Sequence, residues 1–426
     1  MTSPSTRLQW LLLQLGRRLW VRASAFSLLG VATALAASFA SRVIPYQLPD
    51  MIGADAVDSL LNIIAASMLS VTIFSLSTLV SALGSATNNV TPRATRLLSE
   101  DHTAQNALAT FLGSFLFSLV GIIALQTGLY GKSGRVVLYV VTLFVIVVIV
   151  VTLLRWIDYV SRLGRVGETT ERVEDVARRA LVERRDHPCL DARRADGPPP
   201  EDSRPVHAGR MGYVEHIDMS ALSSACGDAC QAWITSLPGT FVDGQRPLAR
   251  LTGTVDDEVC AAVRDAFTVG DARSFDQDPR FGLIVLAEIA SRALSPAVND
   301  PGTAIDVIGR ATRLLALWSE PSESMDADVR HANVHAPEVR VDDLFDDVFT
   351  PIGRDGAGLV EVALRVQKSL LTLARVDDGR YRAAAHRHSA IALARAERAL
   401  DLPDDIAHVR AVAQVIAKLA ELPEYQ

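Results

Sequence analysis

The strongest pattern along the chain is a series of long uncharged runs within its first 160 residues. The four runs cover residues 23–41, 59–92, 103–131 and 136–154. A helix needs about 20 mainly apolar residues to cross a hydrocarbon core of about 30 Å. The pattern therefore predicts a transmembrane domain over residues 1–160, with four spans at about 23–41, 59–85, 105–129 and 136–155.

The second run is longer than one membrane crossing requires. Its 34 uncharged residues would form a helix of roughly 50 Å, because each residue adds about 1.5 Å. The last part, residues 82–92, is small and polar, and Arg93 and Arg96 follow directly. We therefore expect the second span to continue beyond the hydrocarbon region and to end at a basic exit formed by these two arginines.

The second span also carries a stripe of small polar residues. At about 100° per residue these residues fall within one arc of about 100°. They are Ser67, Ser70, Ser77, Thr78, Ser81 and Ser85, joined by Asn88 if the helix continues that far. Such a stripe can serve close helix packing, or it can line a water-filled path. The two interpretations are compatible if the helix packs against copies of itself around an axis.

The charges that flank the four runs predict the orientation of the chain in the lipid bilayer. Arginines gather before the first run, after the second and after the fourth, whereas the first outer loop carries Arg42 with three aspartates. Lys and Arg are enriched in cytoplasmic loops. We therefore expect a multi-pass protein with both termini in the cytoplasm.

The remainder of the chain predicts a soluble region of mixed structure. We expect a juxtamembrane helix over 161–187, a Pro-rich linker over 188–205, a small α/β unit over 206–253 and a helical cytoplasmic domain over 254–426. The periodicity predicts helices over 256–267, 279–294, 301–318, 356–375, 381–400 and 404–422. Residues 321–342 read as an acidic connection, with His331 and His335 in a loop. The predicted fold class is mainly α: a four-helix transmembrane domain, a small α/β unit and a helical cytoplasmic domain.

Composition narrows the range of functions. The formal net charge of −7, carried mainly by the C-terminal half, argues against a nucleic-acid partner. The four cysteines lack metal-binding spacing and are expected to be buried, reduced thiols, which suits the cytoplasm. The sequence has no Walker loop, GxGxxG, HExxH or GxSxG motif. We therefore expect no enzyme activity, no catalytic residues, no cofactor and no metal site.

The most distinctive soluble stretch is residues 276–310. Asp278 and Asp300 each precede a proline and are placed to cap a helix that begins there. Glu288 and Arg292 stand four residues apart and can pair. The polar residues form a cytoplasmic signature cluster: Asp276, Asp278, Glu288, Arg292, Ser295, Asn299 and Asp300. Two interpretations stay open, a ligand or ion site and two well-capped helices with one buried ion pair.

Three stretches together resemble domain-of-unknown-function family 2254, a group of bacterial predicted membrane proteins. They are residues 67–76 with 91–98 at the second span, residues 292–304, and residues 238–249 in the small unit. The family pattern has a Gln and a Ser-Pro-Arg near the end of the second span, where this chain has Asn88 and Thr91-Pro92-Arg93. The resemblance covers most of the chain and implies a bacterial inner-membrane location, and it implies no activity.

Two functional hypotheses follow. The first is a homo-oligomeric channel in the lipid bilayer, which passes ions or a small solute and has the second span nearest the axis. The four uncharged runs contain no acidic or basic side chain of the kind that proton-coupled transport normally needs. The alternative is a membrane-anchored sensor or scaffold whose cytoplasmic helices bind a ligand or a partner.

Overall fold

The structure is a computed structural model. It describes residues 54–99, 102–127, 132–162, 165–321, 329–376 and 379–420, together with three isolated earlier positions, Ser24, Leu28 and Ala32. Apart from these positions, the expected first span at 23–41 lies outside the described residues. The chain divides into two compact units. The first, which we call the membrane unit, contains the described residues within 54–87 and 95–165. The second, which we call the soluble unit, contains Asn88–Ala94 and the described residues from 166 on.

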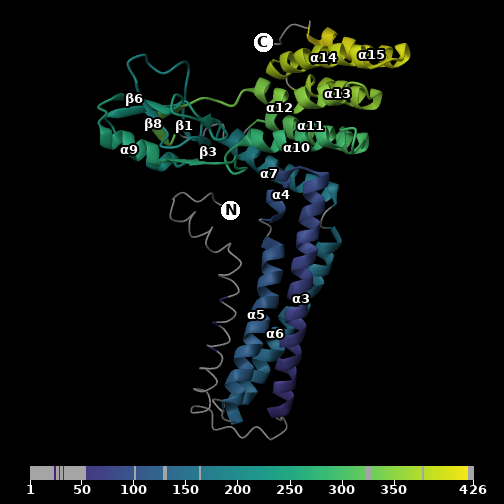
Figure 1. Cartoon of the computed structure of the whole chain (residues 1–426). Coiled ribbons are helices and arrows are strands. Elements are labelled where there is room, and N and C mark those ends of the chain that lie inside the picture. Colours follow the sequence, from purple (N-terminus) through teal and green to yellow (C-terminus); the bar gives the residue numbers. More distant parts are fainter. Residues whose placement is uncertain are drawn as a thin grey trace. The chain divides into compact units, whose positions relative to one another are not determined.

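The membrane unit contains three long helices that run side by side (Figure 1). They are α3 (Ala54–Asn89), α5 (His102–Gln126) and α6 (Lys132–Arg162). Each includes a stretch long and apolar enough to cross a membrane, at Val57–Gly84, Thr103–Gln126 and Arg135–Arg162. These stretches correspond to the second, third and fourth expected spans, so among the described residues the structure supports three of the four.

Large apolar side chains hold the three membrane helices together. Leu61 of α3, Phe111 of α5 and Leu138 of α6 are fully buried. Gly121 of α5 allows close approach, because a Cβ atom there would touch the Leu61 side chain at 3.0 Å. Helices in lipid associate through such close packing of small residues rather than through the hydrophobic effect.

The helical part of the soluble unit is a stack of three helix pairs on a single helix (Figure 1). The base is α7 (Val166–Asp186), which lies where the juxtamembrane helix is expected. The pairs are α10 (Pro279–Ala293) with α11 (Pro301–Ser319), α12 (Val341–Asp355) with α13 (Val360–Leu373), and α14 (Arg380–Ala399) with α15 (Pro403–Ala420). Stacked helix pairs bury a continuous core that no single pair could bury alone.

Helix α12 was not among the expected helices. Its apolar residues have helical spacing, and the buried ones are Val341, Leu344, Phe345, Val348, Phe349 and Ile352. Five aspartates and the internal Pro351 mask that period, because both features are typical of loops. Four of the aspartates bind helices on either side: Asp343 and Asp347 accept hydrogen bonds from Arg280 of α10, and Asp342 and Asp346 accept hydrogen bonds from Arg387 of α14.

Two small sheets complete the soluble unit. The five-stranded sheet has the order β1 (Ala192–Arg194), β8 (His331–Ala336), β4 (Cys230–Ile234), β6 (Pro247–Gly253), β2 (Arg204–His207). The three-stranded sheet has the order β5 (Phe241–Val242), β3 (Gly212–Ile217), β7 (Phe267–Gly270). Strand β8 is parallel to both of its neighbours, whereas the pairs formed by β4, β6 and β2 are antiparallel.

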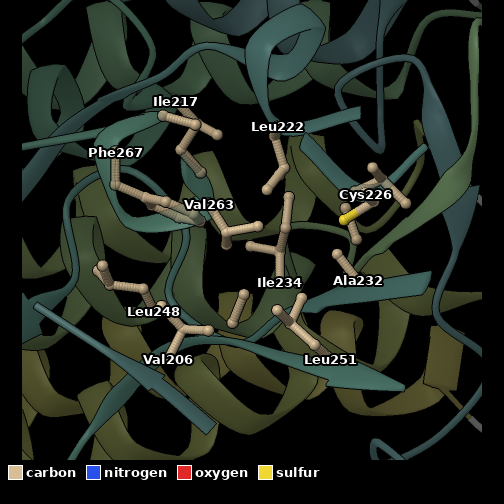
Figure 2. Close-up of a cluster of buried hydrophobic side chains, with 14 of the residues drawn as sticks. Val206, Ile217, Leu222, Cys226, Ala232, Ile234, Leu248, Leu251, Val263 and Phe267 are labelled. Carbon is tan, nitrogen blue, oxygen red and sulfur yellow. The ribbon is translucent and has the colours of Figure 1, made fainter. Parts of the chain in front are cut away.

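The sheets correct three expectations. The expected linker contains strand β1, and the expected loop with His331 and His335 is strand β8. The expected boundary at residue 253 is also wrong, because β7, β8 and α9 (Asp257–Asp265) belong to the same core as the small unit (Figure 2). Short strands from distant parts of the chain join here because each needs hydrogen-bonding partners that its own neighbourhood does not supply.

The cysteines behave as expected. Cys189, Cys226, Cys230 and Cys260 are all free and buried. Burial raises the pKa of the Cys226 thiol to about 12. A thiol with so high a pKa is protonated at neutral pH and is a poor nucleophile or metal ligand.

The contact between α7 and α10 supplies a test of the stack. A Cβ atom on Gly282 would overlap Ala177 of α7, whereas the position of Gly309 in α11 is open. We expect Gly282→Ala to lower the free energy of unfolding by about 1–3 kcal/mol through overpacking. We expect Gly309→Ala to raise it by up to about 1 kcal/mol through helix propensity. Denaturant unfolding of the purified full chain in detergent measures both, and equal effects of the two variants would contradict this account of the packing.

Candidate functional site

The hydroxyl stripe of α3 lies on a face that the other two described spans leave uncovered. Ser67, Ser70, Ser77 and Ser81 are exposed and Thr78 is half-buried, whereas Ser75, which lies off the stripe, is buried. Packing within the described membrane unit therefore does not account for the stripe. The backbone of α3 extends through Ser85 and Asn88, so the helix does continue as far as the last stripe residue; the side chains of these two lie outside the described residues.

The stripe hydroxyls are compatible with an apolar or a wet environment. Ser67, Ser70 and Thr78 donate hydrogen bonds to backbone carbonyls four residues earlier, at 2.6, 3.1 and 2.9 Å. This satisfies the hydroxyl hydrogen without a partner from outside the helix. The hydroxyl oxygens keep acceptor capacity for water, an ion or another helix.

The segment that leaves α3 is buried in the soluble unit. Val90, Thr91 and Ala94 have almost no exposed side-chain surface, and the compact soluble unit includes Asn88–Ala94. Pro92 begins α4 (Pro92–Ser99), and the Thr91 hydroxyl accepts a hydrogen bond from the Arg93 amide at 3.1 Å. This is the arrangement of a helix cap followed by proline at the first helical position.

Glu288 of α10 is bonded to this segment. Its carboxylate accepts a hydrogen bond from the Thr91 hydroxyl at 3.1 Å and one from the Arg93 guanidinium at 2.7 Å. The expected pair between Glu288 and Arg292 does not form between these two described residues, because Glu288 points to Thr91 and Arg93 instead. The charge of Arg93 at the predicted basic exit is therefore partly neutralised, and the side chain of Arg96 lies outside the described residues.

Asp278 caps α10 and forms a buried ion pair. Its carboxylate accepts the Arg280 amide at 3.1 Å and pairs with Arg273 at 2.6 Å. Gly239 lies directly over this pair with a φ of 89°, and a Cβ atom there would overlap Asp278. The turn at Gly239 and the start of α10 thus fit each other closely, and the arrangement is that of a structural anchor.

The turn between α10 and α11 is exposed and internally bonded. Asn299 has a φ of 51°, in the left-handed region that Asn tolerates. The Ser295 hydroxyl donates to the Arg292 carbonyl at 2.7 Å, and Asp300 accepts the amide and the hydroxyl of Thr303 at 3.0 and 2.6 Å. The Thr303 hydroxyl bond lowers the pKa of Asp300. Asp300 is therefore the cap expected from the sequence.

The signature cluster is spread along α10. Asp276, which bonds the Ser274 hydroxyl at 3.1 Å, and Asp278 lie at its N-terminal end, and Glu288 lies further along it. Arg292, which is exposed, and the turn from Ser295 to Asp300 lie at its C-terminal end. A 15-residue helix is about 22 Å long, so these groups do not converge on one ligand. The contact of Glu288 with Thr91 was not expected, since it joins residues 197 positions apart.

A cavity of about 540 Å³ lies elsewhere in the soluble unit, where α7, β1, α11 and α14 meet. Trp318, Val339 and Val341 contribute apolar surface, and Arg185, His187 and Asp191 contribute polar groups. The Nδ1 atom of His187 lies 2.5 Å from the Oδ1 atom of Asp191. Cavities of this size with a few polar groups hold small molecules in many proteins. Among the described residues there is no group of three His, Cys, Asp or Glu side chains that could hold a metal ion.

Comparison with known proteins gives two matches of different extent. The family model described as "Predicted membrane protein (DUF2254)" matches residues 16–372. Uncharacterized proteins of Mycobacterium bovis (Mb1321c) and Mycobacterium tuberculosis (Rv1290c) are each 30% identical over 139 residues, which is 31% of this chain and 26% of theirs. The chain thus spans about a quarter of the length of these curated relatives. No solved structure matches.

The cap at Asp300 supplies a test of the structural interpretation of the turn. We expect Asp300→Ala to cost about 0.5–2 kcal/mol of unfolding free energy at neutral pH, and Asp300→Asn to retain most of the stability because Asn also caps. The pKa of Asp300 is lowered in the folded chain, so its charged form contributes stability above the unfolded pKa. That contribution is lost as the pH falls through the folded pKa. Unfolding of the three proteins at neutral and acidic pH measures this, and an Asn variant as unstable as the Ala variant would contradict it.

Proposed function

The chain belongs to the DUF2254 family of predicted membrane proteins, and from that premise we propose that it is a homo-oligomeric channel with α3 nearest the axis. The observation that carries the proposal is the uncovered hydroxyl face of α3. In a single copy the described spans leave this face to lipid. In a ring of copies it would meet the same face of its neighbours and enclose a polar path.

The composition of the face suits this arrangement. Ser70, Ser77 and Ser81 are small and follow the spacing that lets helix backbones approach closely. Ile63 and Phe74 are also exposed, and at 100° per residue they fall within the same arc. Hydroxyl groups interrupted by large apolar side chains fit a path that closes by dewetting at an apolar constriction.

The charges suit a path of weak selectivity. Residues 59–92 contain no charged side chain, so the path offers no fixed charge to a permeant species. Arg93 follows directly, but its guanidinium is paired with Glu288. The permeant is accordingly an ion or a small solute rather than one class of anion selected by an arginine ring.

A second candidate function is a membrane-anchored sensor or scaffold. The cavity beside Trp318 and Arg185 favours it, because an open cavity of about 540 Å³ in the soluble unit is large enough for a metabolite. In that case the stripe on α3 would be a contact face between helices, and the soluble unit would carry the activity.

Oligomeric state distinguishes the two candidates. We expect the full chain, purified in detergent, to form a closed ring of several copies around α3, seen by light scattering and single-particle imaging. A ring is required because α3 of one copy cannot enclose a path. A monomer, or a dimer without a central axis, would remove the channel proposal and leave the sensor or scaffold.

Side-chain volume on the stripe supplies the direct test of conduction. We expect Ser77→Leu and Ser81→Leu to reduce ion flux through liposomes that contain the protein, because each places a bulky apolar group in the path. Leu76→Phe is the matched control, since Leu76 is exposed on α3 but lies off the stripe. If flux is unchanged in both serine variants, or falls equally in the control, the stripe does not line the path.

A further inference from the structure

We propose that Glu288, with Thr91 and Arg93, is a releasable latch through which the soluble unit controls the end of α3. We call these three residues the Glu288 latch. The regulatory part of this inference rests on the proposed channel function, whereas the latch itself does not.

The residues that Glu288 binds directly follow α3 in the chain. Thr91 lies two residues beyond the end of α3, and Arg93 lies in the first turn of α4. Val90 and Ala94 on either side are fully buried within the soluble unit, so this segment is fixed there by packing as well as by Glu288. Any displacement of α10 that carries Glu288 with it therefore also displaces Thr91, two residues after the end of α3.

Helix α10 contacts two described segments at which the chain passes from one unit to the other. One connection is the segment from Val90 to Ala94, held by Glu288. The other is α7, which follows α6 in the chain and packs against α10 where Ala177 meets Gly282. Ten of the fifteen residues of α10 are buried, so α10 is a rigid element that can transmit a shift between these two points.

The contact of Glu288 with Arg93 is more exposed than the ion pairs that fix α7 to α11. The Glu288 side chain is 30% exposed and that of Arg93 is 59% exposed. In contrast, Glu174 is 6% exposed and accepts hydrogen bonds from Arg310 and Arg313, which fixes α7 to α11. An exposed ion pair contributes little and can open at small cost, whereas a buried carboxylate with two arginines cannot. Compared with the buried Glu174 contact, the Glu288 latch is suited to release.

Hydrogen–deuterium exchange of the full chain in detergent tests the latch without any channel activity. We expect Glu288→Ala to increase exchange about tenfold over residues 88–99, because the variant removes two hydrogen bonds that hold the segment closed. We expect exchange in α12–α15 to stay unchanged. The control is Glu361→Ala in α13, an exposed glutamate with no bonded partner among the described residues, which should leave residues 88–99 unaffected.

A charge exchange completes the test. The double variant Arg93→Glu with Glu288→Arg restores the ion pair, so its exchange over residues 88–99 should return toward that of the wild type. Unchanged exchange in Glu288→Ala, or an increase spread over the whole soluble unit, would overturn the latch. If the latch responds as expected and Glu288→Ala also alters ion flux, the regulatory role holds. If exchange responds and the wild type conducts nothing, the channel proposal fails while the latch stands.

Discussion

The soluble unit depends on one constraint, the burial of α10 on nearly every side. Its sequence is apolar around most of its circumference. Helices α7, α11 and α12 pack against it and bury those apolar side chains. Such a helix needs a small residue wherever a neighbour comes closest, and Gly282 is that residue against Ala177. It also needs partners for its few polar groups, which Arg273, Asp347 and Thr91 provide for Asp278, Arg280 and Glu288.

The same constraint explains why the signature cluster does not form one site. A helix buried along its whole length presents its polar residues only at its ends and through gaps between its neighbours. Asp278 therefore anchors the N-terminal end, Glu288 reaches the segment after α3, and Asp300 begins the next helix. Each polar group has a local structural reason, which favours the interpretation of capped helices over a ligand site. In place of the expected buried pair with Arg292, Glu288 forms a partly exposed pair with Arg93, in the first turn of α4.

Much of this could be predicted from local patterns, and the rest could not. The caps at Asp278 and Asp300 depend on residues two or three positions away, so a short stretch of sequence contains all the information. The spacing of Val341, Leu344 and Val348 does indicate helix α12. Its aspartates are typical of a loop when only the neighbouring sequence is considered, because the arginines that bind them lie far away in the chain. Strand β8 and the contact of Thr91 with Glu288 depend on partners about 100 to 200 positions away, which no local period reports.

The two units also differ in how polar groups are satisfied, and this difference bears on function. In the soluble unit the carboxylates of Glu174 and Asp278 are closed inside the protein by arginines. In the membrane unit the hydroxyls of Ser67, Ser70 and Thr78 bond, among the described residues, to carbonyls of their own helix. The hydroxyl oxygens on this face of α3 can still accept hydrogen bonds. Because lipid tails cannot donate hydrogen bonds, these oxygens can accept one only from water or from another helix. The stripe and the bonded segment after α3 are the two observations behind the proposed model, in which α3 lines a path and Glu288 holds the segment that follows it.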